Sequence, residues 1–450
     1  MTIAPNQLRM EFIQSQEIQE TPKPELSNGR ANKLDPQDRA FHDWYRFVLS
    51  FPPHLVRDYI EKFNLTHKSV VLDPFCGTGT TLVEAKLAKM RAIGLEGNPF
   101  PHLASSVKTD WNLDVDNFSK QARKIAEKAI AILKSQGIDD NLSFSEDKSL
   151  ILKTLSPEVE KLILANSISP LPLHKTLILV ECLKPYENTP FYRHALIALG
   201  NALVFKISNL HFGPEVGVKN LKSDAPVISN WLLEIDKMTN DLRKVSGKPY
   251  PETKVHLADA RSFDMLEPNS VDAVLTSPPY PNEKDYTRTT RLESVLLGFI
   301  NNKEELRELK RRLVRSNTRG IYKGDDDDQW VSNFPEIQRI AEAIENRRIE
   351  LGKDSGFEKL YAKATKLYFG GMAKHLADLR KVLRPGAQLA YVVGDQASYL
   401  RVMIRTGQIL GDIAKSLGYE LVNIDLFRTR LATATKEQLR EEVVILKWKG

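Results

Sequence analysis

The fold is decided by the stretch Asp73-Pro74-Phe75-Cys76-Gly77-Thr78-Gly79-Thr80-Thr81. It follows Val70-Val71-Leu72, a short β-branched run that is typical of a buried strand in a parallel sheet. The apolar residues after it predict a helix over 82–89, and residues 91–96 predict a second strand that ends at Glu96. A strand, a glycine turn, a helix and a second strand together form one unit of a parallel α/β sheet.

The remaining strands are predicted much later in the chain. Residues 101–253 have helical periodicity and predict a mainly helical insertion, after which strand patterns resume. Five further strands are expected, over 254–258, 271–276, 388–393, 420–427 and 441–448, the last two as a closing antiparallel pair. The expected fold class is therefore α/β, with a Rossmann-like seven-stranded sheet and a helical insertion.

The composition is that of an ordinary globular protein. Of 450 residues, 42% are hydrophobic and 27% charged, and the net charge of +6 is weak evidence for a polyanionic partner. No apolar run approaches the roughly 20 residues that cross a membrane. The N-terminus has no secretory signal pattern, so we expect a cytoplasmic protein. Two cysteines, Cys76 and Cys182, predict neither a disulfide framework nor a zinc site, and we expect no metal.

Three predicted strand ends carry residues suited to a nucleoside ligand. In an open α/β sheet, ligands bind beyond the carboxyl ends of the strands. Gly77 and Gly79 let the backbone approach a ligand closely. Glu96 lies 23 residues after Asp73, where a carboxylate can accept hydrogen bonds from both ribose hydroxyls. Asp259 can accept from an adenine amino group. A phosphate-binding loop is excluded, because no Lys follows the second glycine.

The fourth strand ends in Ser277-Pro278-Pro279-Tyr280. Two consecutive prolines fix φ and leave carbonyl acceptors with a defined direction. The Ser277 hydroxyl and the Pro278 carbonyl could accept hydrogen bonds from an exocyclic amino group as it pyramidalises. Tyr280 offers a ring for stacking on a base flipped out of a duplex. Taken alone, the tetrapeptide is also typical of a rigid turn at a strand end.

The glycine turn with its spaced glutamate resembles the S-adenosylmethionine-binding signature of the N4-cytosine and N6-adenine DNA methyltransferases. The tetrapeptide is similar to motif IV of that family, and Phe51-Pro52-Pro53 resembles its motif X. The resemblance covers residues 41–100 and 254–448. It implies a cofactor site built from Phe51, Pro53, Asp73, Phe75, Gly77, Gly79, Thr80, Glu96, Asn98, Asp259 and Ala260, and catalysis by Ser277, Pro278, Pro279 and Tyr280.

The resemblance implies a restriction-modification enzyme that methylates double-stranded DNA by base flipping, in a bacterial-type cytoplasm, with a cognate endonuclease as a possible partner. Serine at the first position of the tetrapeptide favours N4 of cytosine, and N6 of adenine remains the alternative. Attack on C5 of cytosine needs a Cys after a Pro, and neither cysteine follows one. The same motifs are also compatible with an RNA amino-methyltransferase or with a catalytically silent DNA-binding subunit.

We expect a flexible arm over 1–40 and a catalytic domain over 41–100 and 254–450. The charged insertion 283–360 is a candidate target-recognition region, as is the helical insertion 101–253. Residues 303–323 hold eight basic and three acidic side chains, although such runs are often solvated helix faces. The candidate DNA contacts are Tyr286, Arg288, Arg291, Arg312, Arg315 and Arg319. The run Asp325–Asp328 is expected to be a surface loop.

Overall fold

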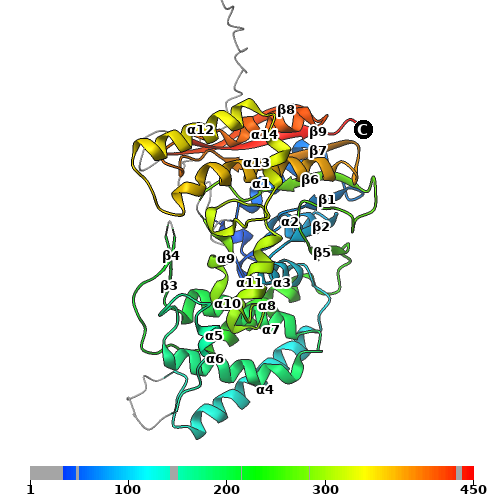
Figure 1. Cartoon of the computed structure of the whole chain (residues 1–450). Coiled ribbons are helices and arrows are strands. Elements are labelled where there is room, and N and C mark those ends of the chain that lie inside the picture. The colour runs from blue at the N-terminus through cyan, green and yellow to red at the C-terminus, as the bar shows by residue number, and fades with distance from the viewer. Residues whose placement is uncertain (1–33, 47–49, 142–150, 214, 283, 432–437) are drawn as a thin grey trace, which may run out of the picture.

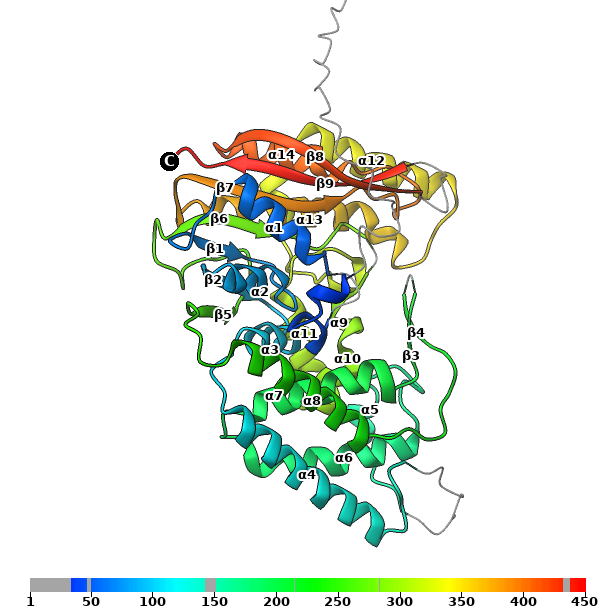
Figure 2. The same ribbon diagram turned by 180° about the vertical axis from the view of Figure 1, so that it is seen from behind.

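The structure is a computed structural model that describes residues 34–46, 50–141, 151–213, 215–282, 284–431 and 438–450. A sheet with helices on both faces forms one part of the molecule, and a helical part adjoins the β5 end of that sheet (Figures 1 and 2). Most of the predicted N-terminal arm, residues 1–33, lies outside the described residues.

The central sheet has seven strands in the order β5-β2-β1-β6-β7-β9-β8. Strands β5, β2, β1, β6 and β7 are parallel, and β9 pairs antiparallel with both β7 and β8. This confirms the predicted α/β fold class and the closing antiparallel pair. The strands are β1 (Val70–Asp73), β2 (Arg91–Glu96), β5 (Thr253–Leu257), β6 (Val271–Thr276), β7 (Leu383–Gly394), β8 (Glu420–Leu431) and β9 (Gln438–Lys447).

Helices bury both faces of this sheet, which explains the nearly continuous apolar character of its central strands. Leu72 and Val274 pack in one core with α12 (Pro335–Glu350), α13 (Tyr361–Leu379) and α14 (Thr406–Ser416). Val71 and Ala273 pack in a second core with α1 (Pro53–Lys62) and α2 (Thr80–Leu87). The alternation along each strand directs neighbouring side chains to opposite faces.

The region between β2 and β5 is mainly helical and has its own core, which includes Phe118, Ile197 and Trp231. Phe41 and Trp44 from the N-terminal segment join this core. Its helices are α3 (Pro99–Lys108), α4 (Val115–Ser135), α5 (Pro157–Glu160), α6 (Pro170–Leu183), α7 (Tyr192–Ala202) and α8 (Ile228–Val245). A short hairpin, β3 (Leu210–Phe212) with β4 (Val216–Val218), was not predicted, and it projects from this helical part beside the sheet part (Figure 2).

The region between β6 and β7 begins with α9 (Tyr286–Thr289), α10 (Arg291–Leu296) and α11 (Lys303–Arg311). The expected surface loop at 325–328 is wrong for Asp327, which is 5% exposed and forms ion pairs with Arg261 and Lys374. Short 3₁₀ turns lie at Pro36–Asp38, His42–Trp44, Lys184–Tyr186, Thr318–Gly320, Asp327–Val331 and Glu358–Leu360, and a π turn lies at Leu203–Ile207.

Candidate functional site

A cavity of about 730 Å³ opens at the carboxyl ends of the central strands. From β1 the chain proceeds to β2 and β5 on one side, and then returns to β6 on the other side of β1. Such a reversal of strand order leaves a crevice where ligands bind in α/β sheets. The hydroxyl of Thr276 at the end of β6 donates to the Asp73 carboxylate at the end of β1, at 2.6 Å. This bond joins the two strand ends beneath the cavity.

The glycine turn shapes one end of the cavity, and its two glycines have different roles. Gly77 lines the cavity with φ +50°, and a Cβ added there would meet nothing within 4 Å. Gly79 has φ +84°, and an added Cβ would lie 3.0 Å from the backbone of Ser105 in α3. Gly77 therefore leaves open space for a ligand, whereas Gly79 permits close packing of the turn against α3.

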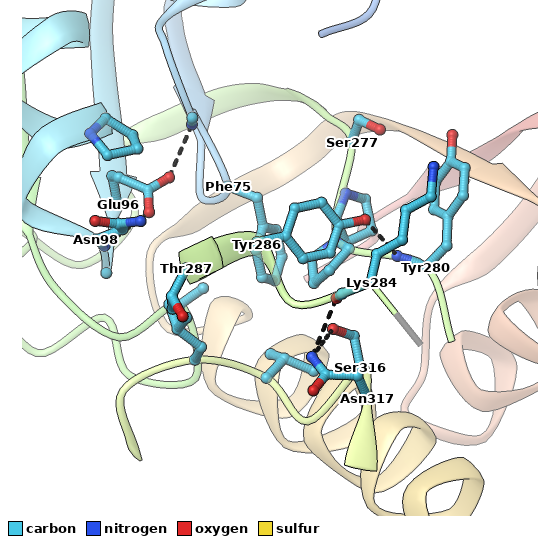
Figure 3. A pocket seen from close by; sticks show the side chains of 18 of the residues that line it. Phe75, Glu96, Asn98, Ser277, Tyr280, Lys284, Tyr286, Thr287, Ser316 and Asn317 are labelled. Atoms are coloured by element: carbon cyan, nitrogen blue, oxygen red, sulfur yellow. Dashed lines mark hydrogen bonds between the residues drawn. The ribbon is translucent and has the colours of Figure 1, made fainter. Parts of the chain in front are cut away.

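Glu96 and Asn98 line the same end of the cavity (Figure 3). The Glu96 carboxylate accepts from the main-chain N–H groups of Gly77 and Asn98, at 2.9 and 2.8 Å. Burial raises the pKa of Glu96 to about 7, although these N–H groups oppose the shift. Asn98 is 4% exposed, and within the described residues its Oδ1 has no hydrogen-bond partner. An unpaired buried acceptor at the cavity wall is suited to a ligand that donates hydrogen bonds.

The other predicted cofactor residues divide into two sets. Phe51, Phe75, Thr80 and Ala260 line the cavity together with the residues above. Pro53, Asp73, Gly79 and Asp259 are not among its lining residues. Asp73 lies just beneath the cavity, and burial raises its pKa to about 6. Its Oδ2 is buried and has no partner in the described part of the chain.

Asp259 does not present a free carboxylate in this structure. It accepts from the main-chain N–H of Arg261 and forms a salt bridge with the same residue's guanidinium, at 2.9 and 2.6 Å. Arg261 also pairs with the buried Asp327. The Asp259 side chain is 28% exposed and its carboxylate has further lone pairs, so the expected contact with an adenine amino group stays a prediction. Ala258 and Ala260, on either side of Asp259, are the residues that reach the cavity.

The tetrapeptide lies at the other end of the cavity (Figure 3). The Ser277 hydroxyl donates to the Val392 carbonyl of β7 at 3.0 Å. The Tyr280 ring packs on β7, because a Cβ added to Gly394 would lie 2.9 Å from its Cε2 atom. The Tyr286 hydroxyl lies 3.4 Å from the main-chain nitrogen of Tyr280 and accepts from it. Burial raises the pKa of both tyrosines, so their hydroxyls stay protonated near neutral pH.

Sequence reasoning missed several residues that complete this end of the cavity: Lys284, Ser316, Asn317, Gln396, Arg428, Arg430 and Glu441. Gln396 comes two residues after β7, so its place after a central strand was an available signal. Arg428 and Glu441 form an ion pair between β8 and β9 at 2.6 Å. Nothing in their sequence pattern distinguishes them from an ordinary cross-strand pair.

The predicted DNA contacts also divide. Arg315 is among the residues that line the cavity, but its side chain is 4% exposed and pairs with Asp325 at 2.7 Å. Arg291 is half-buried and donates to Thr287 and to the Leu162 carbonyl. Tyr286 and Arg312 line the cavity. Arg288 and Arg319, about one-third exposed, each lie 3.9 Å from the carboxylate of Glu215.

The structure contains neither a candidate metal site nor a membrane segment in the parts it describes. Across the described ranges between residues 34 and 450, no three His, Cys, Asp or Glu side chains are grouped to hold a metal ion. Among the described helices, none combines the length and apolar character needed to cross a membrane.

Known proteins resemble this chain along most of its length. A family model described as DNA methylase, for N6 and N4 methyltransferases, matches residues 18–106, which include the glycine turn and Glu96. The Type II methyltransferase M.BsoBI of Geobacillus stearothermophilus is 25% identical, over 96% of this chain and 88% of that protein. The Type II methyltransferase M.AvaI of a Nostoc species is 23% identical, over 96% and 89%. The chain is thus similar to the amino-methylating DNA methyltransferases of restriction-modification systems.

Proposed function

We propose that this protein is a site-specific Type II DNA methyltransferase that transfers a methyl group from S-adenosyl-L-methionine to the exocyclic N4 of cytosine in duplex DNA. The observation that carries the proposal is the Ser277 hydroxyl at the end of β6, held by Val392 at the cavity wall. Serine at this position of the tetrapeptide favours cytosine in this family. The match of residues 18–106 to a family model described as DNA methylase supports DNA as the substrate.

The residues at the glycine turn fit S-adenosylmethionine. Glu96 has lone pairs left to accept from ribose hydroxyls, and Gly77 leaves space above the turn. The Oδ1 of Asn98, which accepts no hydrogen bond from the described residues, offers a further acceptor. When bound, this cofactor supplies a methyl group that is electrophilic because it is attached to a sulfonium. Glu96 at this end of the cavity and Asp73 just beneath it are acidic side chains, which suits a ligand that carries positive charge.

The tetrapeptide would hold the amino group that accepts the methyl. Because the Ser277 hydrogen is directed to Val392, the lone pairs of its Oγ are left to accept from that amino group. The Pro278 carbonyl would take the second amino hydrogen. Two acceptors favour the pyramidal, nucleophilic form of the nitrogen. The Tyr280 ring, fixed against Gly394, would stack on the base. No strong base is needed, since the nitrogen becomes acidic once it is methylated.

Methylation at one sequence implies a target-recognition surface, which we assign to the regions that adjoin the cavity. Arg312, from the charged region, and Glu215, from the β3–β4 hairpin of the helical region, both line it. Either region would contact a duplex whose base has been extruded toward Tyr280. A restriction endonuclease that cuts the same sequence would be the cellular counterpart of such a methyltransferase.

The proposal is tested by expressing the protein in cells that lack DNA methylation and mapping modified bases by single-molecule sequencing. Mass spectrometry of the nucleosides then distinguishes N4-methylcytosine from N6-methyladenine. N4-methylcytosine at one short sequence, absent with Ser277→Ala, is the expected result. N6-methyladenine would move the assignment to adenine. Methylation of tRNA or rRNA with none of DNA would overturn the DNA substrate.

A further inference from the structure

We propose that Gln396 binds the target base, donating from Nε2 to the ring acceptor next to the reacting amino group. This inference rests on the proposed function, because it concerns how the same cavity holds a flipped base. In cytosine that acceptor is N3, with O2 beyond it. No residue of the tetrapeptide offers such a donor, since Ser277 and Pro278 act as acceptors and Tyr280 as a stacking ring.

Gln396 is held close to the tetrapeptide. It lines the cavity two residues beyond Gly394, on which the Tyr280 ring packs. Its main-chain N–H and C=O both pair with Ile404, at 3.1 and 2.7 Å. Asp395, just before it, accepts from the main-chain N–H of Arg440 at 3.2 Å. The backbone of Gln396 is therefore fixed from both sides, and its side chain starts from a defined position.

The segments around Gln396 and the tetrapeptide are joined through one carbonyl. Ser316 O accepts from the Tyr399 hydroxyl and from the main-chain N–H of Asn282, both at 3.0 Å. Asn282 lies two residues after Tyr280, and Tyr399 lies three residues after Gln396. Since Tyr399 is 1% exposed, this junction is buried. It places Gln396 and the tetrapeptide on connected walls of one cavity.

The side-chain amide of Gln396 is buried, and its nitrogen lacks a partner among the described residues. Gln396 is 3% exposed, and this nitrogen is Nε2. A buried amide donor without a partner is unfavourable and calls for an explanation, such as a ligand that pairs with it. The proposed occupant supplies that acceptor. A flipped base is read through hydrogen bonds to its Watson–Crick edge, where the ring nitrogen adjoins the amino group.

A substrate with one atom changed tests the contact directly. In a duplex that carries the mapped methylation site, the target cytosine is replaced by 3-deazacytosine, in which a C–H replaces the N3 acceptor. Single-turnover methylation rates are measured for the wild type and for Gln396→Leu on both duplexes. The change also alters the reactivity of the amino group, but that effect is common to both proteins. For each protein, the rate on the normal duplex is divided by the rate on the 3-deazacytosine duplex. The ratio of these two values, wild type over variant, therefore isolates the hydrogen bond.

We expect Gln396→Leu to methylate the normal duplex about tenfold more slowly, with cofactor affinity unchanged. The 3-deaza substitution should lower the methylation rate of the wild type about tenfold more than it lowers the rate of the variant. Gln396→Met, which has a side chain of similar length and no donor, repeats the test if the leucine variant folds poorly. Gln408→Leu is the matched control, because the buried Oε1 of Gln408 also has no partner in the described ranges but Gln408 does not line the cavity.

The inference is overturned if Gln396→Leu methylates the normal duplex at the wild-type rate. It is also overturned if the 3-deaza substitution lowers the rates of the wild type and of the variant by the same factor. If the mapped base is adenine, 1-deazaadenine replaces the cytosine analogue, and the same comparison of wild-type and variant rates tests the contact. A wild-type protein that methylates no DNA would instead refute the proposed function, and that result is visible in the unmodified duplex.

Discussion

The hydroxyl of Ser277 donates to the carbonyl of Val392, with 3.0 Å between the two oxygen atoms. Val392 lies in β7, the strand beside β6, so a neighbouring strand fixes the rotamer of the serine. A hydroxyl has one hydrogen and two lone pairs, and this bond uses only the hydrogen. The oxygen is thereby preorganised as an acceptor at the place where the tetrapeptide enters the cavity.

Removing this acceptor should slow the chemical step. For Ser277→Ala we expect kcat to fall about 100-fold, as for the loss of one preorganised hydrogen-bonding group in other active sites. The KM for DNA and the affinity for cofactor should stay within about threefold, because neither depends mainly on this oxygen. Transfer of a radiolabelled methyl group measures the rate. Ser332→Ala, at an exposed position outside the cavity, is the control. Equal kcat in both variants would remove Ser277 from the reaction.

The Tyr280 ring should matter more than its hydroxyl. Tyr280→Phe keeps the stacking surface against Gly394, and we expect kcat/KM within about threefold of the wild type. Tyr280→Ala should lose about 1–3 kcal/mol of base stacking, or roughly 5- to 150-fold in kcat/KM. A fluorescent 2-aminopurine at the target position reports base extrusion independently. A large loss in the phenylalanine variant would show that the hydroxyl, and not the stacking surface, is required.

Cofactor binding should depend on pH through Glu96. Burial raises the pKa of this carboxyl to about 7, so it is mostly protonated at pH 6 and mostly ionised at pH 8. The ionised form is the better acceptor for ribose hydroxyls. Affinity for S-adenosylmethionine, measured by calorimetry, should therefore rise several-fold between these values. Glu96→Gln should bind at least tenfold more weakly at pH 8 and show a flat profile. An unchanged pH profile in this variant would assign the titration to another group.

The sequence was sufficient to predict the sheet and the positions of the tetrapeptide and of Glu96. These features depend on local patterns: β-branched runs, a glycine turn and strand ends that converge by topology. Asp259 and Arg315 were harder, because their availability depends on ion pairs that no motif marks: Arg261 lies two residues after Asp259, and Asp325 ten residues after Arg315. Arg261 pairs with both Asp259 and Asp327, and no local pattern in the sequence links them.

Gln396 and the β8–β9 residues show a second limit of prediction. A glutamine after a strand has no motif of its own, and its significance comes from a buried nitrogen without a partner among the described residues. Likewise, the hairpin β3–β4 has strands of three residues, too short for a periodic signal. Such features depend on tertiary packing, which local propensity does not encode.

Two arginines of the charged region should behave differently. Arg315→Ala breaks a buried pair with Asp325 and should destabilise the fold by roughly 3–5 kcal/mol. Arg312→Ala, at the cavity, should leave stability within about 0.5 kcal/mol and weaken DNA binding. If Arg312 contacts a phosphate, the slope of log K against log salt should fall by about one. Chemical denaturation and DNA binding at several salt concentrations measure the two effects. If Arg315→Ala weakened DNA binding and left stability unchanged, the ion pair of Arg315 with Asp325 would have to open when DNA binds.

The pair of Tyr45 and Glu293 should make stability depend on pH. Glu293 is fully buried in α10, accepts from the Tyr45 hydroxyl, and burial raises its pKa from 4.5 to about 7. The folded state thus holds a proton that the unfolded state releases, so the protein loses stability as pH rises from about 4.5 to 7. Glu293→Gln mimics the protonated acid and removes this loss.

At pH 8.5 the variant should therefore be more stable than the wild type by about 3 kcal/mol, at 1.36 kcal/mol for each unit of pKa shift, with little difference at pH 5. Chemical denaturation at both pH values measures the effect. The exposed Glu342→Gln should change stability at neither pH, because water solvates its carboxylate in the folded and unfolded states alike. A gain at pH 8.5 that persists undiminished at pH 5 would trace the effect to packing, because ionisation of Glu293 contributes little below its raised pKa.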